Sequence, residues 1–275
     1  MANKFVFSKW REALGGRIKA IICGSAPLQP KLATIFTNAE IPVLEGYGLT
    51  ECSPVVSVVP FRKQDFRAGC VGKLLPSVQA KIAEDGEILI KAPNVMLGYY
   101  KDEVETKKVF NEDGWLLTGD IGEFTADGFL KITDRKKELY KTSGGKYVAP
   151  SPIENKIKES FFVEQIALQG DGEKFISALI IPNFENLKDW AKQQEISYLS
   201  DEELVQHPQV KQLYKEIITN FNVNFGKVEQ IKQFELLIDE WTTENGLLTA
   251  TMKVKRKVLK EKYKDIIDNF YNKNE

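Results

Sequence analysis

A single carboxylate at a tight corner is the first residue in this sequence that could do chemistry. Asp120 lies within T-G-D-I-G, and the run F-T-A-D-G-F-L-K-I that follows has the pattern of a hairpin. A carboxylate can accept two hydrogen bonds from adjacent hydroxyls, which is what the 2′,3′-diol of a ribose presents. An aspartate at such a corner also caps its own backbone, so an ordinary turn residue is the competing interpretation.

A second polar segment, G-Y-G-L-T-E at 46–51, carries groups that suit a nucleotide. Glycines on either side of Tyr47 would let a ligand approach the backbone, and the aromatic ring could cover a flat base. Thr50 can donate to a phosphate, and Glu51 offers a hard oxygen ligand for Mg²⁺. Taken alone, these residues fit an ordinary strand-to-turn segment with a core tyrosine about as well as they fit a nucleotide site. The polar turn G-S-A-P at 24–27 favours the nucleotide site.

Two lysine-bearing segments could supply positive charge. K-T-S-G-G-K at 141–146 fails the G-x-x-x-x-G-K-[ST] spacing of a phosphate loop, and a plain surface turn stays its competing interpretation. T-M-K-V-K-R at 251–256 opens a run that, taken alone, is typical of a solvated basic helix. A positioned ammonium near a reacting phosphate would neutralise the charge that builds in the transition state.

Two strands and a helix must position the first two polar segments. The apolar run 17–23 predicts a short buried strand, 29–39 has helical spacing, and 41–44 predicts the next strand. Strand, helix and strand imply a right-handed crossover between two parallel strands. The segments 24–27 and 45–51 therefore leave the same carboxyl edge, where nucleotides bind in open α/β sheets.

Downstream of residue 65 the pattern changes to short alternating strands with glycine turns. E-D-G and A-D-G are strong hairpin signals, and 102–110 has helical spacing. This pattern predicts a small antiparallel sheet with strands at 78–83, 87–91, 122–124 and 129–132.

A charged break at 134–137 separates this sheet from the rest of the chain. Beyond it we expect a helix at 151–159, a continuous apolar strand at 175–181, a mostly helical stretch at 183–238 and a closing basic helix at 254–270. The predicted fold class is α/β plus α+β, in three parts. These are the end of a parallel α/β sheet subdomain (1–65), a small antiparallel β subdomain (66–133) and a mobile C-terminal α+β lid domain (134–275).

The composition excludes several classes of protein. Apolar residues make up 43% and charged residues 28% of 275 residues, which is typical of a soluble chain with a sizeable core. Lys plus Arg number 38 against 39 for Asp plus Glu, so the basic excess of a nucleic-acid binder is missing. The three cysteines lack C-x-x-C spacing, which argues against a disulfide framework or a zinc site. With no long apolar run, we expect a cytoplasmic protein.

In this order the motifs resemble those of the adenylate-forming enzymes, the superfamily of acyl-CoA synthetases, insect luciferases and peptide-synthetase adenylation domains. The resemblance rests on G-Y-G-L-T-E, G-W-L-L-T-G-D-I-G at 114–122, T-D-R-K-K-E-L-Y-K-T-S-G-G-K at 133–146 and T-M-K-V-K-R. F-S-K-W-R-E-A-L-G-G at 7–16 and the helical stretch 183–238 are similar to the long-chain fatty-acid–CoA ligases in particular.

The resemblance implies a role for each motif at the nucleotide. Glu51 would hold Mg²⁺, and Asp134 would be the hinge about which the lid rotates between two half-reactions. A solvated linker aspartate is the plainer interpretation of Asp134. The implied nucleotide-binding residues are Gly24, Ser25, Ala26 and Tyr47 for the adenine, Thr50 for the α-phosphate, Asp120 for the ribose, Arg135 for ribose or phosphate, and Gly48.

Lys253 would be the lysine that catalyses adenylation. Ala250 stands where proline is usual and Met252 where many relatives have glycine, so the register stays open and Lys255 is the alternative. The glycine loop would lie along the pantetheine tunnel, where Gly144 and Gly145 admit the thin arm of CoA. Lys141 would assist thioester formation.

The implied reaction joins a long-chain fatty acid to CoA. The acid and ATP would give acyl-AMP and pyrophosphate, and CoA would then take the acyl group. The implied partners are fatty acid, ATP and CoA, with peripheral membrane association and homodimerisation both open. The family's phosphate-gripping loop and most of its acyl pocket would lie upstream of Phe5, so we expect the chain alone to be catalytically silent. A luciferase-like or adenylation-domain relative, or a silent nucleotide-binding fragment, is the alternative.

Overall fold

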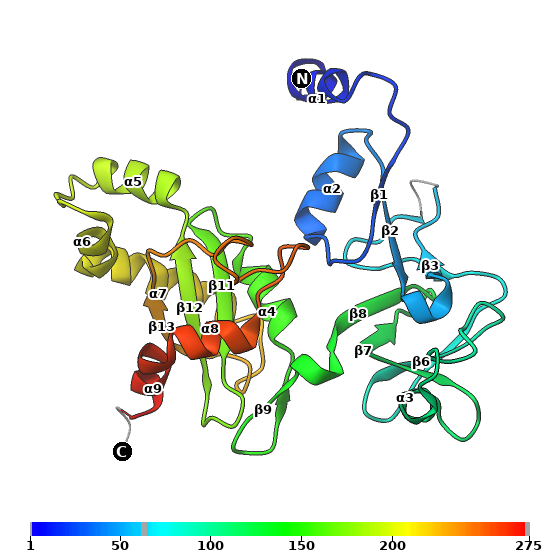
Figure 1. Cartoon of the computed structure of the whole chain (residues 1–275). Coiled ribbons are helices and arrows are strands. Elements are labelled where there is room, and N and C mark those ends of the chain that lie inside the picture. Colours follow the sequence, from blue (N-terminus) through cyan, green and yellow to red (C-terminus); the bar gives the residue numbers. More distant parts are fainter. Residues whose placement is uncertain (1, 62–64, 273–275) are drawn as a thin grey trace. The chain divides into compact units, whose positions relative to one another are not determined.

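The computed structural model describes residues 2–61 and 65–272 and divides the chain into two compact units, Met1–Lys137 and Glu138–Glu275 (Figure 1). Each unit has its own sheets and its own buried apolar clusters. The mixed α/β and α+β fold class predicted from the sequence is confirmed. The division at 65/66 and 133/134 stays a prediction.

The first sheet of unit 1 has the order β1-β2-β3-β4. Strand β1 (Ile21–Cys23) pairs in parallel with β2 (Val43–Gly48), and α2 (Pro30–Asn38) connects them, so the predicted crossover is present. Strands β3 (Val55–Val58) and β4 (Lys73–Leu74) add antiparallel pairs, which makes the sheet mixed. A π-helical turn (Asn3–Phe7) and α1 (Ser8–Ala13) precede the sheet.

Two predictions for this sheet are wrong in detail. The predicted buried strand 17–23 is shorter, and Ile22 within it is 81% exposed because one face of β1 is uncovered. Apolar content alone does not show how many faces of a strand are covered. Strand β2 begins at Val43 and continues through Gly48, so G-Y-G belongs to the strand rather than to a loop. Its ladder with β3 extends the strand beyond the apolar run that predicted it.

The second sheet of unit 1 is an antiparallel meander in the order β5-β6-β7-β8. Both predicted D-G hairpins and the predicted helix are present, and the Asp102 side chain caps that helix by accepting from the amide of Glu105. The elements are β5 (Gln79–Ile82), β6 (Glu87–Lys91), α3 (Glu103–Lys108), β7 (Leu116–Phe124) and β8 (Leu130–Arg135).

The predicted charged break at 134–137 is only partly a break. Strand β8 continues through Arg135, and Asp134 is 5% exposed and pairs with Ile121 of β7. Arg135 lies opposite Asp120 in the same ladder, so opposite charges across the strands allow the pairing to continue. The interpretation of Asp134 as a solvated linker residue is therefore wrong.

Unit 2 is built on a sheet in the order β11-β12-β13, with an antiparallel pair and a parallel pair. Its strands are β11 (Val163–Gln169), β12 (Ile176–Pro182) and β13 (Ile231–Leu236), and a hairpin of β9 (Tyr140–Lys141) and β10 (Tyr147–Val148) precedes it. Every residue of β12 is buried, because apolar clusters cover both faces of the sheet. The prediction of a continuous apolar strand there is confirmed.

Helices cover the two faces of this sheet. One face packs against α4 (Pro150–Ile157), α5 (Phe184–Gln193), α6 (Asp201–Gln206) and α7 (Pro208–Asn222). The other face packs against α8 (Arg256–Lys262), α9 (Lys264–Asn272) and the buried side chains of Trp241, Leu247 and Leu248. Within 2–61 and 65–272, no helix combines the length and the apolar character needed to cross a membrane.

Two helical predictions in unit 2 need correction. Segment 231–236 is a strand, because its apolar residues fit both spacings and pairing with β12 decides between them. The closing basic helix is two helices that meet at Tyr263, whose buried ring packs in the core beside Trp241.

Candidate functional site

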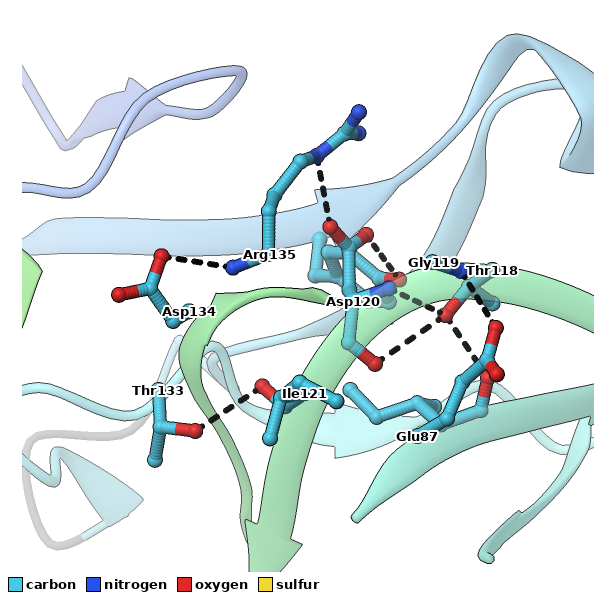
Figure 2. Close-up of polar contacts among 10 residues, drawn as sticks. Glu87, Thr118, Gly119, Asp120, Ile121, Thr133, Asp134 and Arg135 are labelled. Carbon is cyan, nitrogen blue, oxygen red and sulfur yellow. Dashed lines mark hydrogen bonds and ion pairs between the residues drawn. The ribbon is translucent and has the colours of Figure 1, made fainter. Parts of the chain in front are cut away.

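Asp120 is the centre of a buried polar group in unit 1. Asp120 is 5% exposed, and among the described residues each of its carboxylate oxygens has one partner. Arg135 Nε lies 2.8 Å from Oδ1 (Figure 2). The Tyr47 hydroxyl donates to Oδ2 over 2.7 Å. The structure therefore brings together three predicted nucleotide-binding residues, two of them 73 positions apart in the sequence.

The Asp120 carboxylate keeps acceptor capacity for a ligand. Burial and the neighbouring negative charge of Asp120 raise the pKa of the Tyr47 phenol, so this hydroxyl stays protonated and acts as a donor. A carboxylate offers about four lone-pair sites, and among the described residues Tyr47 and Arg135 use two of them. Two neighbouring hydroxyls could use the others.

The tight corner predicted around Asp120 is wrong: Asp120 lies within strand β7, where the pairing with β6 shifts register. Glu87 fixes this irregularity, and the sequence analysis missed it. Gly119 has φ +70° and donates its amide to Glu87 Oε1 over 2.8 Å (Figure 2). Lys136 Nζ lies 2.6 Å from the other oxygen, Oε2, and 2.6 Å from Asp85. A glutamate that begins the apolar strand E-I-L-I directly after a D-G turn is the signal that could have identified it.

The predicted adenine-binding segment lies at the carboxyl end of β1. Ser25 is exposed and has φ +67°, a backbone conformation that non-glycine residues rarely adopt. A Cβ added to Gly24 would stand 3.4 Å from the Gly46 carbonyl oxygen of β2, and Ala26 is half-buried. The segment therefore runs close along the strand that carries Tyr47.

Gly48 is required by the chain's own packing. A Cβ added there would lie 1.7 Å from the carbonyl oxygen of Pro54. The close approach that the sequence analysis assigned to a ligand is, at this glycine, made by the segment before β3.

Glu45 is a second buried carboxylate that the sequence analysis missed. It lies in β2 and is 6% exposed. The backbone amide of Leu28 is hydrogen-bonded to its carboxylate, and its Oε1 has no hydrogen-bond partner among the described residues. Burial raises the pKa of Glu45 to about 7, although the hydrogen bond from the Leu28 amide acts to lower it. The thiols of Cys23 and Cys70 lie close enough for the Glu45 charge to raise their pKa values further, beyond the effect of burial.

We expect the stability of unit 1 to fall as the pH rises from about 4.5 to about 7. Folding raises the pKa of Glu45 from 4.5 to about 7, so the folded state binds the proton more tightly than the unfolded state. Stability from this group is full below about pH 4.5 and is lost above about pH 7, with a change of up to about 3 kcal/mol. Glu45→Gln should therefore stabilise the chain more at pH 8 than at pH 5 in urea unfolding.

Exposed Glu84 supplies the matched control for this measurement. Glu84→Gln removes a carboxylate from a surface turn of the same unit, so it should leave the pH dependence unchanged. An equal effect of Glu45→Gln at both pH values would show that its carboxyl does not titrate in this window.

Thr50 and Glu51 follow β2 in a short 3₁₀ turn, Thr50–Cys52. Thr50 is exposed, and Glu51 Oε1 accepts a hydrogen bond from the Tyr99 hydroxyl over 2.9 Å. Among the described residues no group of three or more His, Cys, Asp or Glu side chains could hold a metal. Mg²⁺ commonly takes one or two carboxylates and completes its shell with phosphate oxygens and water, so a lone Glu51 fits such an ion.

Lys141 and the glycine loop form a hairpin in unit 2. Lys141 ends β9, with its Nζ 5.8 Å from the centre of the Tyr147 ring on β10. The Thr142 amide donates to the Lys146 carbonyl over 2.9 Å, and Gly145 has φ +74°. A Cβ added to Gly145 would meet nothing within 4 Å and one on Gly144 only the Thr142 hydroxyl at 4.0 Å, so the backbone here is open.

Lys253 lies just past the tip of a second loop in unit 2, at 247–255. Leu248 and Val254 pair across the loop, and the Lys253 amide donates to the Thr249 hydroxyl over 3.1 Å. Both Lys253 and Lys255 are exposed. Met252 has φ +60°, in the left-handed region that favours glycine.

Two family patterns match this chain. The one described as "AMP-binding enzyme" matches residues 1–100, and the one described as "AMP-binding enzyme C-terminal domain" matches residues 138–275, about half of the chain. This chain belongs to the AMP-binding enzyme family. The resemblance predicted from the motifs is confirmed.

Curated relatives and solved structures agree with this family. The chain is 38% identical over 272 residues to long-chain-fatty-acid–CoA ligase FadD15 of Mycobacterium bovis, covering 98% of this chain and 45% of that protein. It is 35% identical to long-chain-fatty-acid–CoA ligase 1 of Cavia porcellus, covering 98% and 40%. The chain thus spans less than half the length of these relatives.

A solved structure shares the fold. It is the A domain of the carboxylic acid reductase of Segniliparus rugosus, in complex with AMP and a co-purified carboxylic acid. The TM-score is 0.76 at 25% identity, covering 98% of this chain and 42% of that one.

Proposed function

We propose that this chain is part of an AMP-forming long-chain fatty-acid–CoA ligase. In the first half-reaction a fatty acid attacks the α-phosphate of ATP, giving acyl-AMP and pyrophosphate. In the second the thiol of CoA takes the acyl group and releases AMP. The names of the curated relatives and the AMP-bound neighbour support this proposal. The observation that carries it is the buried Asp120 carboxylate between Tyr47 and Arg135.

Within this proposal the residues of unit 1 bind the nucleotide. Asp120 accepts the ribose hydroxyls, and Arg135, whose guanidinium is 56% exposed, can reach ribose or phosphate. Glu51 would hold Mg²⁺, which would neutralise phosphate charge, and Thr50 would contact the α-phosphate. The segment 24–26 and Tyr47 receive the adenine.

The residues of unit 2 serve the two chemical steps. Lys253 supplies positive charge for adenylation, while Lys141 and the open backbone at Gly145 serve CoA in thioester formation. Met252 supports Lys253 over Lys255, because its φ of +60° fits the place where glycine is expected. Shifting the register by two would assign that place to Val254, which pairs with Leu248 instead.

The remaining proposals concern motion and location. Asp134 is three residues from the boundary between the two units, so a hinge there would act through the end of β8. We further propose a cytoplasmic enzyme that meets its fatty acid at a membrane surface.

AMP binding to this chain tests the proposal. We expect Asp120→Ala to weaken AMP binding by about 10- to 150-fold in an NMR titration, because hydrogen bonds to a charged acceptor contribute about 1.5–3 kcal/mol. The exposed Asp113→Ala variant should bind AMP as the wild type does.

Removing the hydroxyls from the ligand supplies the matched control. Wild-type chain should bind 2′,3′-dideoxy-AMP about as weakly as Asp120→Ala binds AMP, and the variant should not distinguish the two ligands. Equal wild-type affinity for AMP and the dideoxy analogue would contradict the ribose assignment even if the variant misfolds.

A further inference from the structure

Arg256 is held by a network of partners within unit 2, of which Glu154 and Tyr140 are buried. Its Nη1 and Nη2 donate to the two oxygens of Glu154 over 2.7 and 2.8 Å, and Nη1 also donates to the Tyr140 hydroxyl over 3.1 Å. Glu138 Oε2 lies 3.9 Å from Nε. The side chains of Arg256 and Glu154 are only 20% and 11% exposed.

This network ends on the backbone of the central sheet. Glu154 Oε1 accepts a hydrogen bond from the Leu168 amide over 2.8 Å, and the Tyr140 hydroxyl donates to the Leu168 carbonyl over 2.6 Å. Leu168 belongs to β11, so both backbone groups of one buried residue hold the partners of Arg256. The guanidinium therefore has a fixed position relative to the sheet.

The network also touches the base of each lysine loop. Tyr140 directly precedes Lys141 in β9, and Arg256 follows Lys253 by three positions as the first residue of α8. The Lys255 amide donates to the Leu247 carbonyl over 2.8 Å, which closes the second loop immediately before Arg256.

We propose that Arg256 and Glu154 are positioning residues that fix the glycine-loop hairpin (140–148) and the Lys253 loop (247–255) on one rigid base. The part of this proposal that concerns catalysis rests on the proposed function of Lys141 and Lys253. Lysines assigned to different half-reactions thus keep a constant separation within unit 2.

The chemistry of the contact requires arginine. A guanidinium presents parallel N–H groups that match both oxygens of a carboxylate, whereas an ammonium is a point charge on a flexible stem. Arg256→Lys keeps the charge and loses the two-point contact. Glu154→Gln keeps the shape and the acceptor for Leu168, but it turns an amide NH₂ towards the guanidinium.

Amide hydrogen exchange of the 275-residue chain tests the anchoring without any activity. We expect Arg256→Lys to speed exchange at least tenfold in both 140–148 and 247–255, with less than a twofold change in β12. Glu154→Gln should have the same effect, and the double variant should add little, because both changes break one contact. The control is Lys188→Gln, which breaks an exposed ion pair with Asp201 in the same unit and should change neither loop.

Three outcomes would overturn the proposal. Faster exchange in the Lys253 loop alone would make Arg256 a local anchor, and equal acceleration throughout unit 2 would make it a general stability residue. Additive effects of the two substitutions would show that they do not act through one contact. A protein of the relatives' length that carries this chain and forms no acyl-adenylate would contradict the proposed function while leaving the exchange result standing.

Discussion

Lys253→Ala should lower the rate of acyl-adenylate formation by about 100- to 1,000-fold in a protein of the relatives' length that carries this chain. Attack of a carboxylate on the α-phosphate builds negative charge on both groups, and removing one positioned charge or donor typically costs about 2.7–4 kcal/mol of transition-state stabilisation. Lys253 is exposed near the tip of a loop whose base is anchored, so its ammonium can reach a substrate. Fatty-acid-dependent exchange of pyrophosphate into ATP measures this step.

The second half-reaction distinguishes a catalytic lysine from a structural one. Thioester formation from supplied acyl-AMP and CoA should stay within about twofold of wild type, because the role proposed for Lys253 is confined to the phosphoryl step. Lys260→Ala, which removes an exposed lysine from α8, should change neither step. If Lys255→Ala gave the loss and Lys253→Ala did not, the register would be displaced by two residues. Equal loss of both steps would make Lys253 structural.

Local patterns predicted the elements whose cause is local. The two D-G turns give the hairpins of the second sheet, and the uninterrupted apolar run of β12 gives a strand covered on both faces. Two of the wrong secondary-structure predictions are those in which pairing between strands decides the element. β13 is a strand because β12 offers it a parallel partner, and β8 continues through Asp134 because Arg135 lies opposite Asp120.

At the candidate site, the motifs identified three residues that contact one another and missed two buried carboxylates. Asp120, Tyr47 and Arg135 were named from the sequence, and the structure brings them into contact. Glu45 and Glu87 are equally buried, but their partners are backbone amides and a distant lysine. Such contacts depend on the path of the folded chain, so the motifs do not reveal them. At Glu87 the local signal is a glutamate that begins an apolar strand directly after a D-G turn.

Gly72 has the largest expected effect on the stability of unit 1. It has φ +92°, and an added Cβ would lie 1.9 Å from the carbonyl carbon of Val58 and 2.1 Å from the Val59 amide nitrogen. Both neighbours are backbone atoms, so no side-chain rotation relieves the clash. The sheet itself must shift.

This glycine also lies where the two sheets of unit 1 are joined. The Leu130 amide of β8 donates to the Gly72 carbonyl over 2.8 Å, and the Val71 amide donates to the Leu130 carbonyl over 2.8 Å. The first sheet carries Tyr47 and the second carries Asp120, so this junction helps to set the distance between them.

We expect Gly72→Ala to destabilise unit 1 by about 4 kcal/mol or more and to abolish AMP binding by this chain. A steric clash with immobile backbone belongs to the small class of changes that cost this much, and it adds to about 1–2 kcal/mol for a left-handed alanine. Gly128→Ala is the matched control, because Gly128 has φ +80° but an added Cβ would meet nothing within 4 Å. Gly128→Ala should destabilise unit 1 only by the cost of a left-handed alanine, about 1–2 kcal/mol. Hydrogen exchange resolves the two units, and exchange in β12 of unit 2 should stay unchanged in both variants. Similar destabilisation by the two variants would show that the clash is relieved at little cost and that the junction does not constrain the site.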